Sequence, residues 1–318
     1  MVDVDEVAEN IYMIDDQICS IPKLGSVYLL NEEKKALVDT GPPSSAGVVL
    51  EGIRKVGVKP EDINYVIATH IHLDHAGGAG VLLKDMPQAR VVVHHKGAKH
   101  LIDPAELLES ALKALGAELI ALQGEVAPVE PHRVQLVYDN DTVKLSDKQV
   151  LEFIDAPGHA EHELCIYERR NGGLFAGDAL GLYLAEGEVL VEGHPPPSFD
   201  LEACINTIQR LMKLNPSLIY FAHFGASDKV QEILQLAIDK IRYYGNMVAK
   251  AAEEDTLDEV TERMIAQVRE ELEPVRKVPP LYEFVIKNLI PSFIAGFMHY
   301  QKRKEKAGLA GRGASESN

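Results

Sequence analysis

The heptapeptide THIHLDH, residues 69–75, carries three histidines and one aspartate. The preceding residues 63–68 are apolar and rich in β-branched side chains, with Pro60 upstream, which predicts a buried strand. Gly77 and Gly78 follow, so the polar residues lie on a loop at the end of that strand, a common position for a binding or catalytic site. Neutral imidazole nitrogens and carboxylate oxygens are ligands that zinc and similar divalent metals take. The segment therefore predicts a metal site rather than scattered polar loop residues.

The pattern His70-x-His72-x-Asp74-His75 resembles the signature of the metallo-β-lactamase superfamily. The resemblance predicts further ligands downstream, and matching motifs follow in the expected order. These motifs are Ala156-Pro157-Gly158-His159, Ala176-Gly177-Asp178-Ala179 and Phe221-Ala222-His223-Phe224-Gly225, with the family element Val38-Asp39-Thr40-Gly41 upstream. The match extends from about residue 7 to about residue 226, and its five ordered motifs make it specific.

The expected architecture is an α/β fold. Predicted strands and helices alternate in the first part of the chain, which favours layers of both kinds. The resemblance implies more specifically an αββα sandwich, with the metals at one edge between two sheets. It places a metallo-β-lactamase-like catalytic domain over residues 1–226. We expect a C-terminal helical region over 227–302 and a disordered tail over 303–318, where the sequence is charged and then small and polar.

A helical insertion is expected within the catalytic domain at about residues 95–133. Asp103-Pro104 is typical of a helix start and Gly116 of a helix end, and leucines between them form an apolar stripe. We expect this insertion to lie over or beside the mouth of the active site. The histidines near it lack tight ligand spacing, so loop and surface positions are favoured over a second metal site. They are His94, His95, His100 and His132.

The resemblance also assigns the ligands of two divalent metal ions, with zinc favoured and iron or manganese as alternatives. One metal would be held by His70, His72 and His159, and the other by Asp74, His75 and His223, with Asp178 between them. The resemblance implies that a metal-bridging hydroxide attacks the substrate and that Asp74 also carries a proton to the leaving group. His162, three residues after His159, is expected to hold a ligand in place rather than to bind metal.

The expected activity is hydrolysis of a small-molecule ester, thioester or lactone. Asp178 stands where zinc β-lactamases have a cysteine, so the chain looks more like the glyoxalase II and lactonase branches. The alternatives are a metal-dependent phosphodiesterase or nuclease, a mononuclear iron sulfur dioxygenase that uses only the first site, and a non-catalytic partner protein. The long insertion domain and the Pro-x-Lys-x-Arg-Asn motif of related nucleases are absent from the sequence.

Two short segments after Asp178 are candidates for substrate contact. Tyr183 in Gly181-Leu182-Tyr183-Leu184 offers a phenol near the site, and His194 precedes three prolines that would form a stiff wall. The alternatives, Tyr183 in the core and His194 on the surface, remain open at this point.

Composition sets the expected partners and location. The formal net charge of -17 disfavours nucleic acid, whose binding needs a clustered basic surface. Three widely spaced cysteines fit a reducing cytoplasm better than a disulfide frame. The acidic amino terminus carries no apolar signal segment, and no run of 18 apolar residues predicts a membrane span. The expected partner is a small-molecule substrate, and the C-terminal helices are expected to form either a substrate wall or the surface of a homodimer.

Overall fold

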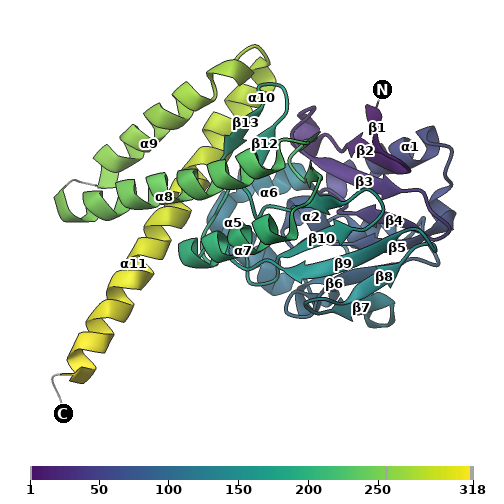
Figure 1. Ribbon diagram of the computed structural model, residues 1–318, viewed down its shortest axis with the longest axis horizontal. Coiled ribbons are helices and arrows are strands. Elements are labelled where there is room, and N and C mark those ends of the chain that lie inside the picture. Colours follow the sequence, from purple (N-terminus) through teal and green to yellow (C-terminus); the bar gives the residue numbers. More distant parts are fainter. Residues whose placement is uncertain (1, 255–256, 316–318) are drawn as a thin grey trace.

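The computed structural model describes residues 2–254 and 257–315, and within them two β-sheets pack face to face (Figure 1). The first sheet has the order β1-β2-β3-β4-β5-β6-β7 and the second the order β15-β14-β11-β10-β9-β8. Side chains from both sheets form the core between them, where the rings of Tyr28 and Phe175 meet at a centroid distance of 5.2 Å. Helices cover both outer faces. The expected αββα sandwich is therefore confirmed.

The first sheet changes from antiparallel to parallel pairing at β4, and strands β4 to β7 then run in one direction. Ile63, Val66 and Ile67 of β5 are fully buried, as the apolar sequence predicts. The strands of this sheet are β1 (Val4–Ala8), β2 (Ile11–Asp15), β3 (Ser26–Leu30), β4 (Lys35–Val38), β5 (Ile63–Ile67), β6 (Arg90–His94) and β7 (Val134–Val137).

The second sheet supplies three further strand ends to the edge where β5 ends. Its strands are β8 (Thr142–Lys144), β9 (Val150–Asp155), β10 (Leu164–Glu168), β11 (Gly173–Phe175), β14 (Leu218–Phe221) and β15 (Gly225–Ser227). A separate hairpin of β12 (Leu182–Leu184) and β13 (Val189–Val191) follows β11.

Helices pack on each outer face through apolar residues at helical spacing. Val49 and Ile53 of α1 (Ala46–Lys55) pack on the first sheet, and Ile208 and Leu211 of α7 (Leu201–Leu214) pack on the second. Two short helices, α2 (Leu73–Ala76) and α3 (Ala79–Leu82), follow β5 directly.

The expected insertion at about 95–133 contains three helices in the structure. They are α4 (Ala98–Ile102), α5 (Ala105–Leu115) and α6 (Ala117–Gln123). The carboxylate of Asp103 accepts a hydrogen bond from the backbone N–H of Ala105 at 3.2 Å, and Gly116 ends α5 with a φ of +82°. Both signals used to place α5 are therefore present in the structure.

The C-terminal region is helical, as expected, and lies beside the second sheet (Figure 1). It consists of α8 (Val230–Glu254), α9 (Leu257–Glu271), α10 (Pro279–Phe284), a π-helical turn (Val285–Leu289) and α11 (Ile290–Ser315). A disordered tail was expected from residue 303, whereas α11 continues to Ser315; residues 316–318 lie outside the described part of the chain. Extending an existing helix is easier than starting one, which explains how α11 runs on into a polar sequence.

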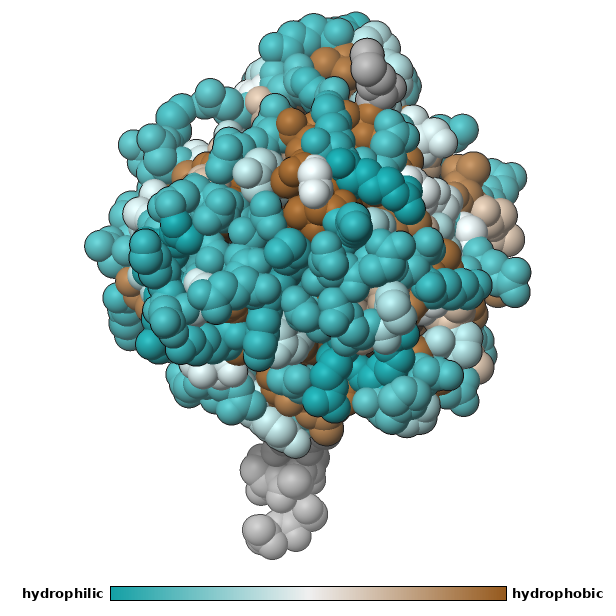
Figure 2. All heavy atoms as spheres, turned by 90° about the vertical axis from the view of Figure 1, so that its right-hand side faces the viewer, coloured by the Kyte–Doolittle hydropathy of each residue, from teal (hydrophilic) through white to brown (hydrophobic). Residues whose placement is uncertain are grey.

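One described helical segment, Pro279–Lys306, is long and apolar enough to cross a membrane by length and composition. Of its most apolar window, 44% is buried inside the fold, and a core helix passes the same test. The face shown in Figure 2 is mainly hydrophilic, with a limited group of hydrophobic side chains in its upper part. The absence of a membrane partner therefore stays a prediction.

Candidate metal centre

All seven residues expected to bind metal come together at one edge of the sandwich. His70 and His72 follow β5, and Asp74 and His75 belong to α2. The other three follow strand ends of the second sheet, where β9, β11 and β14 stop. These three are His159, Asp178 and His223.

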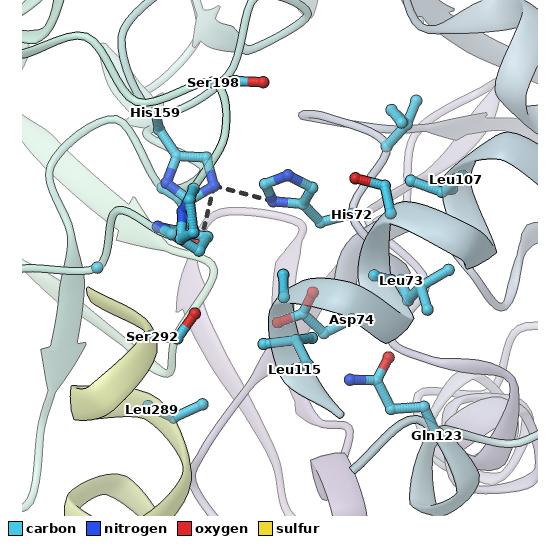
Figure 3. A pocket seen from close by; sticks show the side chains of 18 of the residues that line it. His72, Leu73, Asp74, Leu107, Leu115, Gln123, His159, Ser198, Leu289 and Ser292 are labelled. Atoms are coloured by element: carbon cyan, nitrogen blue, oxygen red, sulfur yellow. Dashed lines mark hydrogen bonds and ion pairs between the residues drawn. The ribbon is translucent and has the colours of Figure 1, made fainter. Parts of the chain in front are cut away.

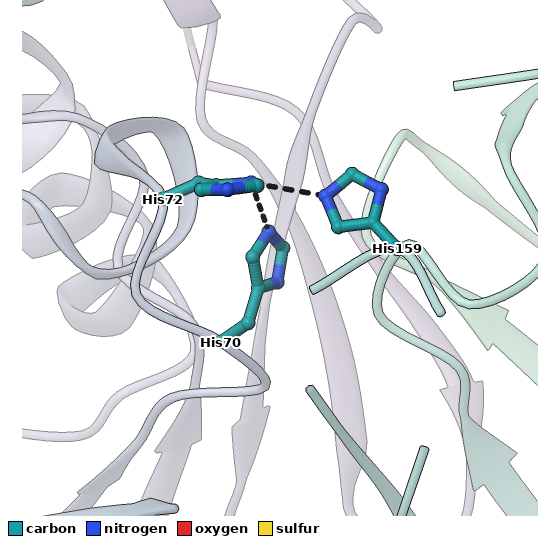
Figure 4. Close-up of side chains that lie close together, drawn as sticks. All are labelled: His70, His72 and His159. Atoms are coloured by element: carbon teal, nitrogen blue, oxygen red, sulfur yellow. Dashed lines mark hydrogen bonds between the residues drawn. The ribbon is translucent and has the colours of Figure 1, made fainter. Parts of the chain in front are cut away.

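The first group consists of three imidazoles whose nitrogens converge (Figure 4). Nε2 of His70 and Nε2 of His159 each lie 2.9 Å from Nδ1 of His72. A single ring nitrogen can donate or accept along one direction only, so it cannot satisfy both neighbours. Three converging nitrogen lone pairs are what a metal ion satisfies, and this donor set fits zinc.

The second group is built around the carboxylate of Asp178. Its Oδ2 lies 3.5 Å from Nε2 of His75, 3.5 Å from Nε2 of His223 and 3.7 Å from Nε2 of His159. Oδ2 of Asp74 lies 3.7 Å and 3.8 Å from the same atoms of His75 and His223. The carboxylate of Asp178 therefore lies next to histidines of both groups, where a ligand shared by two metal ions would be.

Two buried atoms of the second group have no hydrogen-bond partner among the described residues. They are Nε2 of His75 and Oδ1 of Asp178. A buried polar atom without a partner costs stability, so such atoms mark strain, function or a missing ion. Since both atoms point into a cluster of ligand type, the residues fit bound divalent metal.

In the second group, an oxygen lies behind the imidazoles of His75 and His223, which leaves the opposite nitrogen free to bind metal. Nδ1 of His75 lies 3.1 Å from Asp39, whose carboxylate also accepts from the backbone N–H of Thr69 at 2.8 Å. Nδ1 of His223 donates to the carbonyl of Leu24 at 3.0 Å.

A buried glutamate that sequence reasoning missed supports the first group. Oε2 of Glu163 lies 3.2 Å from Nδ1 of His70, and its Oε1 accepts from the backbone N–H of Asp178 at 2.9 Å. In the sequence Glu163 stands among other polar residues and resembles a surface glutamate. Its role depends on β10 bringing it to the end of β5, which no local signal reveals.

The pKa shifts differ between the two groups. Burial is the main cause that lowers the pKa of His70 and of His159 well below the usual value, so both rings are neutral, as metal ligands must be. Burial alone would lower the pKa of His75, but Asp178 and Asp74 raise it well above the usual value. The second group therefore attracts positive charge, which suits a cation.

His162 lies beside the first group and contacts it through its ring. The centroid of its ring is 5.8 Å from that of His72 and 6.3 Å from that of His70, which it stacks on at 10°. Burial lowers the pKa of His162 to about 3, so it is neutral. His162 therefore lies beside the ligands, and its expected role in holding a ligand in place stays a prediction.

The two residues expected to contact substrate are not at the cavity wall, and those expectations need correction. Tyr183 points into the core from β12 and stacks on Phe221 at 4.3 Å. His194 is also fully buried, because its side chain turns inward and stacks on Phe199 at 4.7 Å. Their neighbours line the cavity instead, namely Leu182, Gly193 and residues 195–198.

The four histidines near the insertion form no ligand group of three among the residues that the structure describes. Nε2 of His94 instead lies 3.2 Å from Asp155, and the exposed His132 lies 3.6 Å from Glu130. The interpretation as loop and surface residues therefore fits His132. His94 is buried, His95 is half-buried, and the half-buried His100 belongs to α4 and lines the cavity.

A cavity of about 370 Å³ opens onto the ligands (Figure 3). His72, Asp74, His159, Asp178 and His223 all line it. Its walls are mainly apolar and include the α5–α6 insertion and the segment from α10 to α11, together with parts of the segments 18–24 and 193–198. In Figure 3, Leu289 and Ser292 on the C-terminal segment lie across the cavity from Leu107 on α5. The apolar side chains that line the cavity in these two regions include Leu107, Ala111, Leu115, Leu289 and Phe293.

Comparisons with known proteins agree with this geometry. The sequence model described as the metallo-β-lactamase superfamily matches residues 21–223. A metallo-β-lactamase fold-containing protein of Sulfurisphaera tokodaii is 29% identical over 216 residues, which are 66% of this chain and 77% of that protein. An N-acyl homoserine lactonase of Bacillus cereus is 30% identical over 225 residues, 62% of this chain and 79% of the lactonase. The crystal structure of a metallo-β-lactamase family protein from Thermus thermophilus superposes with a TM-score of 0.67 at 18% identity, covers 95% of each chain and supports the fold.

Proposed function

Because this chain belongs to the metallo-β-lactamase superfamily and is thus a metal-dependent hydrolase, we propose that it hydrolyses a small lactone, ester or thioester that carries an apolar chain. The observation that carries this proposal is the apolar cavity that opens directly onto the ligand groups. The likeness to a protein named as an N-acyl homoserine lactonase supports a lactone among these substrates.

We further propose that the site holds two divalent metal ions, with zinc favoured. Support comes from the two ligand groups and from Asp178, whose Oδ2 lies within 3.7 Å of His75, His159 and His223. Metal ions bound there would lower the pKa of a water molecule toward neutrality and polarise the substrate carbonyl. Imidazole and carboxylate ligands also allow iron or manganese, so metal content is the first quantity to measure.

Asp74 is the residue placed to move a proton. It lines the cavity and keeps 27% of its side chain exposed, whereas Asp178 is nearly buried. In hydrolysis water adds to the carbonyl carbon, the carbon–oxygen or carbon–sulfur bond breaks, and the leaving group takes up a proton. Asp74 would accept the proton of the water and deliver it to the leaving group.

The apolar walls would bind the chain of the substrate. Leu107 lies across the cavity from Leu289, and Ala111 and Phe293 also line the cavity. Burying a methylene among these side chains contributes about 0.8 kcal/mol. The cavity size falls within the usual range for small-molecule sites. The C-terminal region therefore serves as a substrate wall in this proposal.

Filling the cavity is expected to separate long substrates from short ones. Ala111→Phe places a ring between the two walls, so we expect kcat/KM for the longest chain to fall by at least about tenfold. The value for the shortest chain should change by less than about threefold. The measurement uses γ-lactones and acyl thioesters whose alkyl chain grows from about two to about ten carbons.

The matched control is Ala117→Phe, an exposed position on α6 outside the cavity lining. It should leave both values unchanged. If Ala111→Phe lowers turnover equally for substrates of all chain lengths, the alkyl chain of the substrate does not lie in this cavity. If no carbonyl substrate is turned over by the metal-loaded chain, the proposed reaction itself fails.

Other expectations about partners stay proposals. The net charge of -17 makes us propose that the chain does not bind nucleic acid, which disfavours the nuclease alternative. We also propose a cytoplasmic location and a homodimer formed through the C-terminal helices.

A further inference from the structure

A buried carboxylate and a buried imidazole lie in line behind the metal ligand His159. Oε2 of Glu192 lies 3.1 Å from Nε2 of His194, and Nδ1 of His194 lies 3.4 Å from Nδ1 of His159. On its other side, Nε2 of His159 lies 2.9 Å from Nδ1 of His72 within the first ligand group. The exposed fractions of Glu192, His194 and His159 are 4%, 0% and 1%.

We propose that Glu192 and His194 are positioning residues that keep the proton of His159 on Nδ1, so that Nε2 faces the metal as a ligand. This inference rests on the proposed metal centre but not on the identity of the substrate. It also gives His194 a role different from the substrate contact expected from the sequence.

The direction of each hydrogen bond follows from the first member of the row. Nε2 of His194 lies 3.1 Å from the carboxylate of Glu192, and because a carboxylate only accepts, we infer that this nitrogen carries a hydrogen. In the tautomer with its hydrogen on Nε2, His194 has a lone pair on Nδ1, which can accept the hydrogen on Nδ1 of His159 at 3.4 Å. His159 is left with its lone pair on Nε2, the atom that points into the ligand group.

No other hydrogen bond explains why Glu192 is buried. Among the described residues, neither of its carboxylate oxygens has a hydrogen-bond partner beyond the ion pair with His194. Burying a carboxylate is unfavourable unless it is paired, so the contact with His194 is what offsets the burial. Acceptors behind a metal-binding histidine commonly fix its tautomer and orientation.

The C-terminal helix holds this row in place. The ring of His194 stacks on Phe199 with an angle of 1°, and Phe199 meets Phe297 of α11 at 4.8 Å. A Cβ atom added to Gly296 of α11 would lie 1.8 Å from the carbonyl oxygen of His194, so the helix backbone packs directly on that residue. The stack on Phe199 therefore holds the ring of His194, while α11 packs on the backbone of the same residue.

The test compares two disruptive variants with two conservative ones in the zinc-loaded full chain. Glu192→Leu and His194→Phe remove the acceptors, and the phenyl ring keeps the stack on Phe199. Glu192→Gln keeps an oxygen acceptor, and His194→Asn can place its amide oxygen near the position of Nδ1. Zinc affinity is measured by competition with a chromophoric chelator, and the protonated nitrogen of His159 by nitrogen NMR of labelled imidazoles.

We expect Glu192→Leu and His194→Phe to weaken zinc binding by about 10- to 100-fold, the usual effect of losing such a supporting contact. Glu192→Gln and His194→Asn should stay within about threefold of the unmodified chain, with Nδ1 of His159 still protonated. The matched control is His94→Phe, which removes another buried, ion-paired histidine outside the ligand groups and should leave zinc affinity unchanged.

Several outcomes would overturn the proposal. Unchanged zinc affinity in Glu192→Leu or in His194→Phe would contradict it. An equal loss of zinc affinity in all four variants would also contradict it, because such a loss indicates a packing effect and not the loss of a hydrogen-bond acceptor. If His194→Phe does not fold, the pair Glu192→Leu and Glu192→Gln decides by the same comparison. Loss of zinc affinity in the expected pattern without any hydrolytic activity would leave this inference standing and reject the proposed reaction.

Discussion

Replacing Asp178 with alanine is expected to remove metal from both ligand groups at once. One oxygen of Asp178 lies 3.5 Å from Nε2 of His75, 3.5 Å from that of His223 and 3.7 Å from that of His159, so no other carboxylate serves both groups in the described structure. We expect the unmodified chain to hold about two metal ions after reconstitution and Asp178→Ala to hold fewer than about one. Elemental analysis after removal of loosely bound metal gives this number.

A matched control for this experiment is Asp155→Ala. Asp155 ends β9, close in sequence to His159, but its carboxylate pairs with His94 rather than with a ligand group. Metal content should be unchanged in this variant. Full occupancy of both positions in Asp178→Ala would show that the assignment of Asp178 as the shared ligand is wrong.

Replacing His223 with alanine is expected to lower hydrolytic kcat by at least about a hundredfold. His223 belongs to the second group, with its Nε2 near Asp74 and Asp178, so its loss removes a ligand where charge is stabilised in the transition state. The unmodified chain should turn over an ester, lactone or thioester without oxygen. The measurement is kcat for one such substrate under nitrogen, with metal content determined in the same samples.

This experiment also separates hydrolysis from the sulfur dioxygenase alternative. By the family resemblance, a mononuclear dioxygenase would bind iron through His70, His159 and Asp178 and would not need His223. Oxygen consumption with a persulfide substrate that survives in His223→Ala, without any esterase activity, would reject the hydrolase. The control His94→Ala lies outside both ligand groups and should keep full hydrolytic activity.

The sequence was sufficient to predict the sandwich and the seven candidate ligands. Four of these ligands lie within one short segment after β5, so their proximity is a local property of the chain. His159, Asp178 and His223 come from strand ends in the other sheet, and only the ordered family motifs could relate them to the first four. The structure brings them to the same edge because both sheets end there.

Residues behind the ligands could not be predicted in this way. Glu163 and Glu192 are buried carboxylates, but in the sequence they resemble solvated glutamates. The partner of Glu163, His70, comes from a distant element, whereas Glu192 contacts His194 two residues further on. The inward turn of His194 depends on Phe199 and on α11, which lies about a hundred residues further along the chain. Hydrophobic spacing predicts which face of an element is buried, but not which polar side chain is carried inward with it.

The contact between Gly296 and the carbonyl oxygen of His194 affects how this chain can diversify. Residue 296 lies beyond the segment 21–223 that matches the superfamily, yet it fits against the backbone behind a metal ligand. A larger residue at 296 would require the backbone at residues 194 and 195 or the helix α11 to shift. We therefore expect that the C-terminal helices would not serve as an interchangeable module, because α11 packs directly on the backbone next to the candidate metal centre.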